Sequence, residues 1–260
     1  MALVTGAGSA PGLVGIGVGI AVLFADQGAA VGVVDISRER AEHTKALIDA
    51  IGGRAIAVVG DLTKDDDSAR CVADVVEEFG HLDTLVNCAA IVGGGGSPAT
   101  VDLTEWDAVM AVNLQAAVLS ARYAIPHLQA AGGGAIINIA SVAASRGHGA
   151  GAYAASKGAL LALTRDWAYV HGRDGIRVNC ILPGHVFTPM GDQGGEEVRR
   201  RRRRAGLLGS EGDAWDVAWP AVFLASDEAR WITGVEIPVD AGATSSAAFA
   251  VGLLNDRSPD

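Results

Sequence analysis

The stretch that decides the fold lies near the start of the chain and reads Leu3-Val4-Thr5-Gly6-Ala7-Gly8-Ser9-Ala10-Pro11-Gly12-Leu13-Val14-Gly15-Ile16-Gly17. A short apolar run, residues 3–5, precedes the glycines, and an apolar segment with helical spacing, residues 17–27, follows them. Glycine lets backbone N–H groups approach a ligand closely, and a helix N-terminus carries partial positive charge. This order of strand, glycine-rich turn and helix predicts a site for the phosphates of a dinucleotide.

Apolar runs and helical segments alternate along the rest of the chain. Strands that read as continuous apolar runs are typical of a parallel sheet covered on both faces. No linker-like composition interrupts the pattern, so we expect one α/β domain over residues 1–260, a Rossmann-like doubly wound parallel sheet with helices on both faces. The expected strands are 3–5, 30–35, 55–60, 82–87, 135–141, 176–182 and 235–239, and the expected helices are 17–27, 38–51, 65–79, 104–128, 153–170 and 213–225.

The composition narrows the class of protein. Half of the 260 residues are hydrophobic, and 20 basic against 30 acidic side chains give a net charge of −10. Such a chain repels polyanions, so we expect neither a nucleic acid nor a membrane as partner. Cys71, Cys88 and Cys180 are odd in number and widely spaced, and the histidines lack metal-ligand spacing. We therefore expect no disulfide and no metal, a cytoplasmic location and a small-molecule ligand.

Small or polar residues end the second, third and fourth expected strands. Asp35 ends the second, Asp61 and Leu62 follow the third, and Asn87 ends the fourth. Ligands of doubly wound sheets bind outside the carboxyl ends of the strands. Asp35 is placed to accept hydrogen bonds from both hydroxyls of an adenosine ribose, although an Asp here is also an ordinary helix N-cap.

Tyr153 and Lys157 are four residues apart in a helical segment and therefore share one face. A nearby ammonium favours phenolate, so we expect Lys157 to lower the pKa of Tyr153 toward a value useful for proton transfer. Ser141 closes the apolar run twelve residues earlier, and Asn113 lies in the preceding helical segment. Such a Tyr/Lys pair alone is usually a solvated helix pair, so this context carries the prediction.

Over nearly its whole length the sequence resembles the classical short-chain dehydrogenase/reductase family. The resemblance rests on the glycine-rich turn, Asp61-Leu62, Asn87-Cys88-Ala89-Ala90, Val112-Asn113, Ser141, Tyr153 with Lys157, Ile176-Arg177-Val178-Asn179, Pro183-Gly184 with Thr188, Ile232-Thr233-Gly234 and Val239-Asp240-Ala241-Gly242.

The resemblance implies that Tyr153 exchanges a proton with the substrate oxygen and that Ser141 polarises this oxygen. Lys157 would hold the nicotinamide ribose, and Asn113 would support a water that links Lys157 to solvent. It also implies a homotetramer whose interfaces use the helices that contain Asn113 and Tyr153. The expected cofactor contacts are Gly6, Gly15, Ile16, Asp35, Ile36, Asp61, Leu62, Asn87, Ala89, Tyr153, Lys157, Pro183, Gly184, Val186 and Thr188.

The sequence departs from the family pattern in three places. Eight residues separate Gly6 from Gly15, where the family's usual spacing has three. Asn87-Cys88-Ala89-Ala90 replaces the usual N-N-A-G, and Asp240-Ala241-Gly242 replaces D-G-G. We expect the last two to be tolerated, whereas the longer phosphate loop leaves the pyrophosphate contacts open.

These features lead us to expect an NAD(H)-dependent oxidoreductase that interconverts a small or medium secondary alcohol and its ketone. Asp35 should repel the 2′-phosphate of NADP(H), and we expect Arg38 to be a solvated first-turn residue that does not offset this repulsion. The alternatives are a 3-oxoacyl-type reductase of the same family and a non-catalytic dinucleotide-binding scaffold or regulatory protein.

Variable loops build the substrate pocket, so the sequence does not identify the substrate. We expect a lid at about residues 188–212 and a packed C-terminal tail, 243–260. The six arginines 199–204 should form an exposed charged helix, with recognition of an acidic substrate as the alternative. We expect Cys88 to be a small buried hydrophobe, and His148 lies in a loop that would border the pocket.

Overall fold

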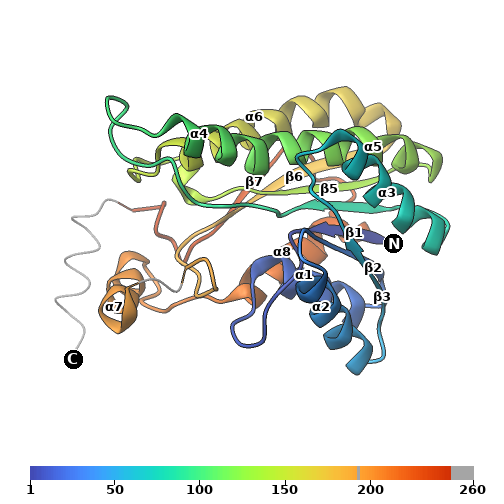
Figure 1. Ribbon diagram of the computed structural model, residues 1–260, viewed down its shortest axis with the longest axis horizontal. Helices are drawn as coiled ribbons and strands as arrows, with labels where there is room; N and C mark the ends of the chain where they lie inside the picture. Colours follow the sequence, from blue (N-terminus) through green and yellow to red (C-terminus); the bar gives the residue numbers. More distant parts are fainter. Residues whose placement is uncertain (192–193, 247–260) are drawn as a thin grey trace.

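The computed structural model describes residues 1–191 and 194–246. Seven parallel strands form one sheet in the order β3-β2-β1-β4-β5-β6-β7 (Figure 1). The strand order reverses between β1 and β4, which opens a crevice at the carboxyl ends of these strands. The strands are β1 (Ala2–Thr5), β2 (Ala30–Asp35), β3 (Arg54–Val59), β4 (Thr84–Asn87), β5 (Gly134–Ile139), β6 (Ile176–Pro183) and β7 (Glu236–Val239).

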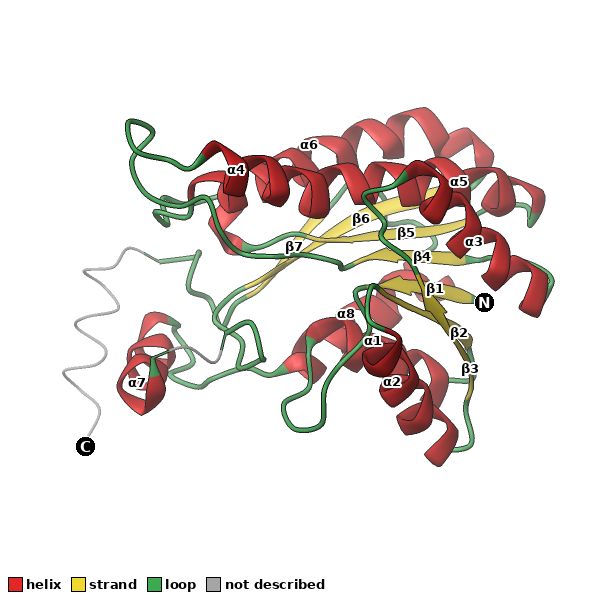
Figure 2. Ribbon diagram, viewed as in Figure 1, coloured by secondary structure: helices red, strands yellow, loops and turns green. Residues whose placement is uncertain are grey.

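Helices cover both faces of the sheet. Figure 2 shows α1, α2 and α8 on one face and α3, α4, α5 and α6 on the other, with α7 apart from both layers. This arrangement confirms the expected fold class. The helices are α1 (Ile16–Asp26), α2 (Arg38–Ala50), α3 (Asp65–Phe79), α4 (Leu103–Met110), α5 (Ala116–Ala130), α6 (Gly151–His171), α7 (Gly195–Ala205) and α8 (Ala214–Ala225).

The buried strands explain why the sheet needs two helical layers. Every residue of β1, β2 and β4 is buried. Side chains of a strand alternate between the two faces, so apolar residues throughout a strand must be covered on both sides. One core cluster joins β1 and β2 to α1 and α8, and another joins β4 and β5 to α3 and α5.

Local signals in the sequence mark where helices begin and end. Three aspartates open α3, where the helix dipole favours negative charge, and Gly80 closes it in the left-handed conformation at φ 86°. A capping box of Asp213 and Asp216 opens α8.

The helix expected over 104–128 is more complex in the structure. The segment η1 (Ala111–Gln115) is π-helical and joins α4 to α5, so the helical stretch Leu103–Ala130 is continuous. By length and composition alone this stretch passes a test for membrane-spanning helices, which core helices of soluble proteins also pass. Its residues Ala116, Ala121 and Leu128 belong to the core cluster beneath it, so we interpret it as a packed helix.

One further difference from the expectations concerns the loop after β5, whereas the lid contains a helix over the arginines, as expected. Strand β5 ends at Ile139, so Ser141 follows the strand and caps a short 3₁₀ helix, η2 (Val142–Ala144). Within the expected lid, the structure contains α7. Residues 247–260 of the expected tail lie outside the described residues, as do residues 192–193 of the lid.

Candidate active site

A cleft of about 1110 Å³ runs along the carboxyl ends of the strands. We call the part lined by residues after β1, β2 and β3 the β1–β3 end, and the part lined by residues after β5 and β6 the β5–β6 end. The expected site residues that line the cleft are Gly6, Gly15, Ile16, Asp35, Ile36, Asp61, Leu62, Ala89, Ser141, Tyr153, Lys157, Pro183, Gly184, Val186 and Thr188. Asn87 and Asn113 do not line it.

Two glycines allow the backbone to pack closely where β1 meets the cleft. Gly6 has φ 62°, and a Cβ atom there would lie 2.6 Å from the Cα atom of Ala89. A Cβ atom on Gly17 would lie 2.4 Å from the carbonyl oxygen of Gly6. The hydroxyl of Thr5 accepts hydrogen bonds from the N–H groups of Cys88 (2.9 Å) and Ala89 (3.2 Å). The ends of β1 and β4 are therefore held together by close backbone packing at Gly6 and by the hydroxyl of Thr5.

The lengthened phosphate loop folds back onto the end of β2. The N–H of Ala7 donates to the carbonyl oxygen of Val34 (3.1 Å), and that of Gly8 donates to Oδ2 of Asp35 (3.1 Å). The N–H of Ser9 donates to the carbonyl oxygen of Arg40 (3.2 Å). These bonds show how the extra residues are accommodated.

The N-terminus of α1 fits the phosphates of a dinucleotide. Gly15 is its N-cap and makes no side-chain capping bond, and a Cβ atom on Gly15 would meet nothing within 4 Å. The first N–H groups of a helix have no hydrogen-bond partner within the helix. They carry partial positive charge and can donate hydrogen bonds to an anionic ligand. Because Gly15, Ile16 and Gly17 all line the cleft, this helix end can receive a pyrophosphate.

Asp35 has a cationic neighbour that the sequence analysis missed. One guanidinium nitrogen of Arg40 lies 3.0 Å from Oδ1 of Asp35, and the N–H of Ser37 donates to the same oxygen (2.9 Å). The carboxylate side chain is only 8% exposed, yet both Asp35 and Arg40 line the cleft. Arg38 is exposed at the start of α2 and lies 4.0 Å from Glu42, as expected of a solvated residue. The sequence offered one signal for this contact: Arg40 lies two residues after Arg38, where the expected helix begins, and so close to the end of the second strand.

Ser141, Tyr153 and Lys157 meet at the β5–β6 end. Tyr153 and Lys157 lie one turn apart on α6, with Nζ of Lys157 5.8 Å from the centroid of the Tyr153 ring. Lys157 is buried, and its Nζ donates to the carbonyl oxygen of Ile139 (2.8 Å), the last residue of β5. Strand β5 thus holds both Ser141, two residues beyond its end, and the ammonium of Lys157.

Burial governs the ionisation of this pair. It raises the pKa of Tyr153, and a hydrogen bond with Ser141 opposes this effect. The pKa of Tyr153 is therefore raised overall and not lowered as expected, because desolvation of the phenolate outweighs the contributions that favour it. Burial also lowers the pKa of Lys157 to about 8.

Asn113 does not line the cleft but is hydrogen-bonded to residues that adjoin it. It lies in the π-helical segment, is 1% exposed, and its Oδ1 accepts a hydrogen bond from the N–H of Ile91 (2.8 Å). Its Nδ2 donates to the carbonyl oxygen of Ile91 (2.9 Å) and to Oγ of Ser156 (3.1 Å). The side chain thus fastens the loop after β4 to the residue preceding Lys157.

Asn87 belongs to a buried polar chain below the cleft. The pairing of β4 with β5 places Asn87 opposite Asn138, and Nδ2 of Asn87 donates to Oδ1 of Asn138 (2.9 Å). Nδ2 of Asn138 donates to Oγ1 of Thr164 on α6 (2.9 Å). This chain sets the position of α6, and therefore of Tyr153, relative to the sheet.

The departures from the family pattern have visible consequences. Ala241 has φ 54°, a left-handed conformation that glycine adopts more readily. Cys88 lines the cleft, and burial raises the pKa of its thiol to about 11, so the thiol stays protonated. This state agrees with the expectation that Cys88 behaves as a small hydrophobe.

The cleft also contains side chains that the expected site did not include. His148 lines it, as its loop position suggested, together with His185 and Arg202. In residues 1–191 and 194–246, no group of three or more His, Cys, Asp or Glu side chains could hold a metal ion.

Comparison with known proteins places this geometry in a family. The family model described as enoyl-(acyl carrier protein) reductase matches residues 12–244. A 2,5-dichloro-2,5-cyclohexadiene-1,4-diol dehydrogenase of Sphingobium indicum is 37% identical over 243 residues, covering 93% of this chain and 95% of that protein. A meso-2,3-butanediol dehydrogenase of Serratia marcescens is 36% identical over 245 residues, covering 94% of each.

Solved structures agree with the sequence relatives. A crystal structure assigned to a short-chain dehydrogenase/reductase of Burkholderia xenovorans has a TM-score of 0.89 at 39% identity and covers 95% of this chain and 96% of that one. The fold, the matched family model and these relatives confirm the resemblance seen in the sequence: the chain belongs to the classical short-chain dehydrogenase/reductase family of oxidoreductases.

Proposed function

We propose that the chain is an NAD(H)-dependent oxidoreductase that interconverts a small or medium secondary alcohol and its ketone. The observation that carries the proposal is one continuous cleft that joins an open helix N-terminus to Ser141, Tyr153 and Lys157. The two relatives named above are diol dehydrogenases, which agrees with alcohol chemistry.

Each side chain has a distinct role in the proposed reaction. A bound nicotinamide supplies the hydride in ketone reduction and accepts it in alcohol oxidation. During reduction, Tyr153 donates its phenolic proton to the oxygen that becomes the alcohol, and Ser141 donates a hydrogen bond to the same oxygen. During oxidation, the Tyr153 phenolate accepts that proton.

Lys157 supports the phenolate and holds the nicotinamide ribose. An ammonium has three N–H donors, and one of them is used by the carbonyl oxygen of Ile139. The positive charge near the Tyr153 ring stabilises the phenolate that forms after proton transfer. Asn113 is a positioning residue in this proposal, and it supports the water that connects Lys157 to solvent.

Coenzyme choice depends on Asp35 and its neighbours. Members of the family bind NAD(H) or NADP(H). We propose a preference for NAD(H), because a 2′-phosphate carries about −1.5 to −2 charges and Asp35 carries a negative charge at the expected ribose position. Arg40 offsets part of this repulsion, so we expect a smaller preference than an isolated Asp35 would produce.

A 3-oxoacyl-type reductase is the second candidate, because a 3-oxoacyl-[acyl-carrier-protein] reductase of Thermotoga maritima is 34% identical over 241 residues, covering 92% of this chain and 96% of that protein. The test is a panel of secondary alcohols, their ketones and a 3-oxoacyl thioester, each followed by nicotinamide absorbance with both coenzymes. Turnover of simple alcohols and ketones supports the leading proposal, and turnover of the thioester alone supports the second. Coenzyme binding without any turnover would support the scaffold alternative.

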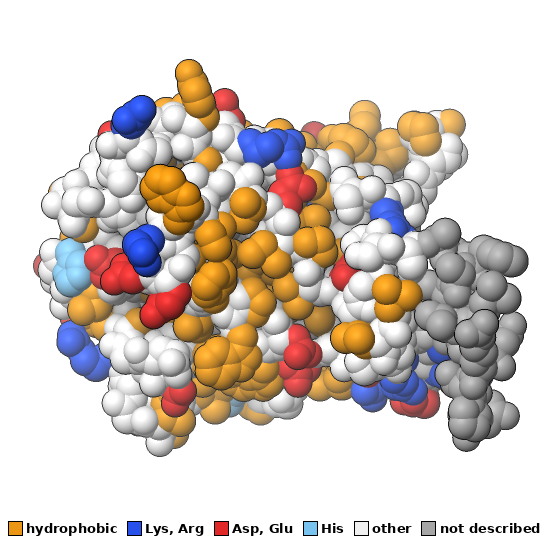
Figure 3. All heavy atoms as spheres, turned by 180° about the vertical axis from the view of Figure 1, so that it is seen from behind, with side chains coloured by type: hydrophobic (Ala, Val, Ile, Leu, Met, Phe, Trp, Pro, Cys, Tyr) orange, Lys and Arg blue, Asp and Glu red, His pale blue; other side chains and the backbone are white. Residues whose placement is uncertain are grey.

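We also propose that the chain forms a homotetramer. Exposed apolar residues on the expected interface helices support it: Val118 on α5, and Tyr169 and Val170 on α6. The outer side of α8 adds Trp215, Trp219 and Phe223, spaced four residues apart. Figure 3 shows hydrophobic side chains gathered across the centre of one face of the molecule. Mass photometry at several protein concentrations measures the subunit number.

A further inference from the structure

The β5–β6 end of the cleft carries an unusual set of basic side chains. His148, His185 and Arg202 all line it, and the two imidazole rings lie 6.0 Å apart between centroids, at 43° to each other. Of the carboxylates that line the described cleft, Asp35 is the last residue of β2 and Asp61 follows β3. Since the sheet order separates these strands from β5 and β6, the two ends differ in charge.

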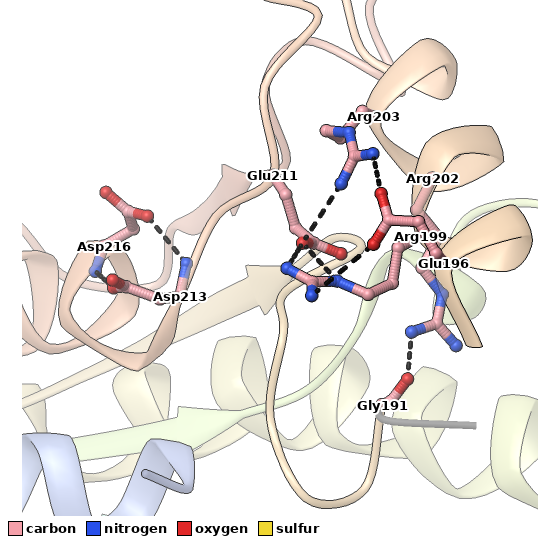
Figure 4. Close-up of polar contacts among 8 residues, drawn as sticks. All are labelled: Gly191, Glu196, Arg199, Arg202, Arg203, Glu211, Asp213 and Asp216. Atoms are coloured by element: carbon pink, nitrogen blue, oxygen red, sulfur yellow. Dashed lines mark hydrogen bonds and ion pairs between the residues drawn. The ribbon is translucent and has the colours of Figure 1, made fainter. Parts of the chain in front are cut away.

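The arginines of α7 have different partners (Figure 4). Nε of Arg199 lies 2.9 Å from a carboxylate oxygen of Glu211, and its guanidinium stacks 3.8 Å from the centroid of the Phe187 ring. Arg203 contacts Glu196 and lies 3.7 Å from Glu211. Arg200 and Arg201 are exposed and pair with Glu197. These pairs account for the charges expected on a solvated helix.

Arg202 is arranged differently from these neighbours. It is half-buried, lines the cleft, and donates a hydrogen bond to the carbonyl oxygen of Gly191. Within the described part of the chain, no carboxylate is recorded within 4.0 Å of its guanidinium. A guanidinium offers five N–H donors, so one carbonyl oxygen leaves most of its hydrogen-bonding capacity available.

The surroundings of Arg202 leave a net positive charge at this end of the cleft. Burial, followed by the charges of His148 and Arg202, lowers the pKa of His185, so its ring is neutral near pH 7 and can donate one N–H. Asp240 is the nearby acid, and its carboxylate already accepts bonds from the N–H of Gly242 and from the N–H and hydroxyl of Thr244. One guanidinium matches a singly charged anion better than a phosphate dianion, and the neutral ring of His185 adds one hydrogen-bond donor.

We propose that Arg202 binds a carboxylate of the substrate, so that the substrates are hydroxy acids and the matching oxo acids. This inference rests on the proposed oxidoreductase function and specifies its substrate class. Of the six arginines, one faces the reaction cleft in this way, while its exposed neighbours remain paired on the outer surface. The expectation of an exposed charged helix therefore holds for Arg200 and Arg201, and acidic-substrate recognition is assigned to Arg202.

The test compares oxo acids with their methyl esters, which keep the ketone but remove the negative charge. We use 4-oxopentanoate and 4-oxocyclohexanecarboxylate, each with its ester, and measure kcat/KM at two salt concentrations. We expect the acids to be preferred at least about tenfold, with the preference reduced by salt. Equal kcat/KM for acid and ester would overturn the inference, while turnover of both would leave the proposed oxidoreductase function intact.

Variants of α7 assign the effect to one residue. Arg202→Gln should raise KM for the acids at least about tenfold and leave the esters unchanged, and Arg202→Lys should retain part of the preference. Arg201→Gln is the matched control, because Arg201 is the exposed neighbour of Arg202. This variant should leave KM unchanged for both the acids and the esters. An equal effect of the two glutamine variants would contradict the assignment.

A binding measurement separates this inference from the proposed function. Calorimetric titration of each acid and ester into the wild-type protein and Arg202→Gln does not require turnover. If no compound is turned over but the acids bind through Arg202, the oxidoreductase proposal fails and the carboxylate site stands. If esters are turned over and the acids show no Arg202-dependent binding, the carboxylate site fails.

Discussion

At the β1–β3 end of the cleft, the groups that face a ligand are backbone N–H groups, two carboxylates and the guanidinium of Arg40, whereas at the β5–β6 end they are hydroxyl, imidazole, ammonium and guanidinium side chains. The first end is built from one continuous stretch of chain, β1 through α1, together with the residues that end the next two strands. The second end combines the loops after β5 and β6 with α6 and α7. A site made of backbone depends on local chain geometry, while a site made of side chains depends on how distant segments pack.

The difference suggests a division of labour between the ends. A dinucleotide is common to the whole family, so its phosphates can be held by backbone groups that tolerate variation in side chains. Substrate choice needs side chains that vary among relatives and are carried on loops. Tyr153 and Lys157 lie at the β5–β6 end, and substitutions there and at the β1–β3 end test the comparison.

The largest expected effect is that of Tyr153→Phe. Removing the phenolic proton donor should lower kcat by about 10²- to 10⁴-fold while coenzyme binding survives, because the β1–β3 end is untouched. Steady-state kinetics and a fluorescence titration with the coenzyme measure the two effects. Tyr169→Phe, on the same helix but 87% exposed, is the control and should keep wild-type kinetics. A Tyr153→Phe variant with more than about a tenth of wild-type turnover would remove Tyr153 from the mechanism.

The next effect tests the β1–β3 end. Asp35→Ser should reduce the preference for NAD(H) over NADP(H) by about 10- to 100-fold, mainly through the coenzyme KM, because it removes the carboxylate that repels a 2′-phosphate. The measurement is kcat/KM for both coenzymes with one accepted substrate. Asp61 lies at the same end of the cleft, and Asp61→Asn should change kcat/KM for both coenzymes by the same factor. A wild-type protein that prefers NADP(H) would show that Asp35 is not the ribose acceptor.

Lys157 provides a stability test at the β5–β6 end. Its folded-state pKa of about 8 lies below the ordinary 10.5, so the folded chain releases this proton before the unfolded chain does. The unfolded chain then binds more protons between these values, and this residue makes the free energy of unfolding rise as pH increases from about 8 to about 10.5.

Lys157→Met should therefore increase the free energy of unfolding at pH 7 by about 1 to 3 kcal/mol while abolishing activity, since it removes a buried charge. The gain should shrink at pH 10, where the wild-type lysine is largely neutral. Urea unfolding at both pH values measures it, with Lys45→Met as the control, because Lys45 lies on α2 and is paired with Asp49. A loss of stability at pH 7 would contradict the burial penalty.

The smallest expected effect refines the coenzyme prediction. Arg40→Ala removes the cation 3.0 Å from Oδ1 of Asp35 and should widen the preference for NAD(H) by about three- to tenfold. Arg38→Ala, its exposed neighbour on α2, should leave the ratio of kcat/KM values unchanged. If the two variants behaved alike, the Arg40 contact would have no influence on coenzyme choice.

Sequence periodicity located the strands and most helices because apolar runs and helical spacing are local properties. Strand β2 and helix α3 have the expected bounds, Ala30–Asp35 and Asp65–Phe79. The π-helical segment around Asn113 was not expected, since it depends on how Asn113 is bonded to Ile91 and Ser156. Asn87, expected at the cofactor, does not line the cleft, and its side chain bonds to Asn138, which bonds in turn to Thr164; only strand pairing and helix packing bring these residues together.

The sequence by itself determined the doubly wound fold, the glycine-rich turn before α1 and the set of Ser141, Tyr153 and Lys157, because each is encoded by short-range spacing or by the type of residue that ends a strand. The tertiary structure alone decided that Arg40 pairs with Asp35, that burial raises the pKa of Tyr153, and that Arg202 among six arginines lines the cleft. These properties depend on distances between separate segments and on exclusion of water, and neither quantity is present in a linear order of residues.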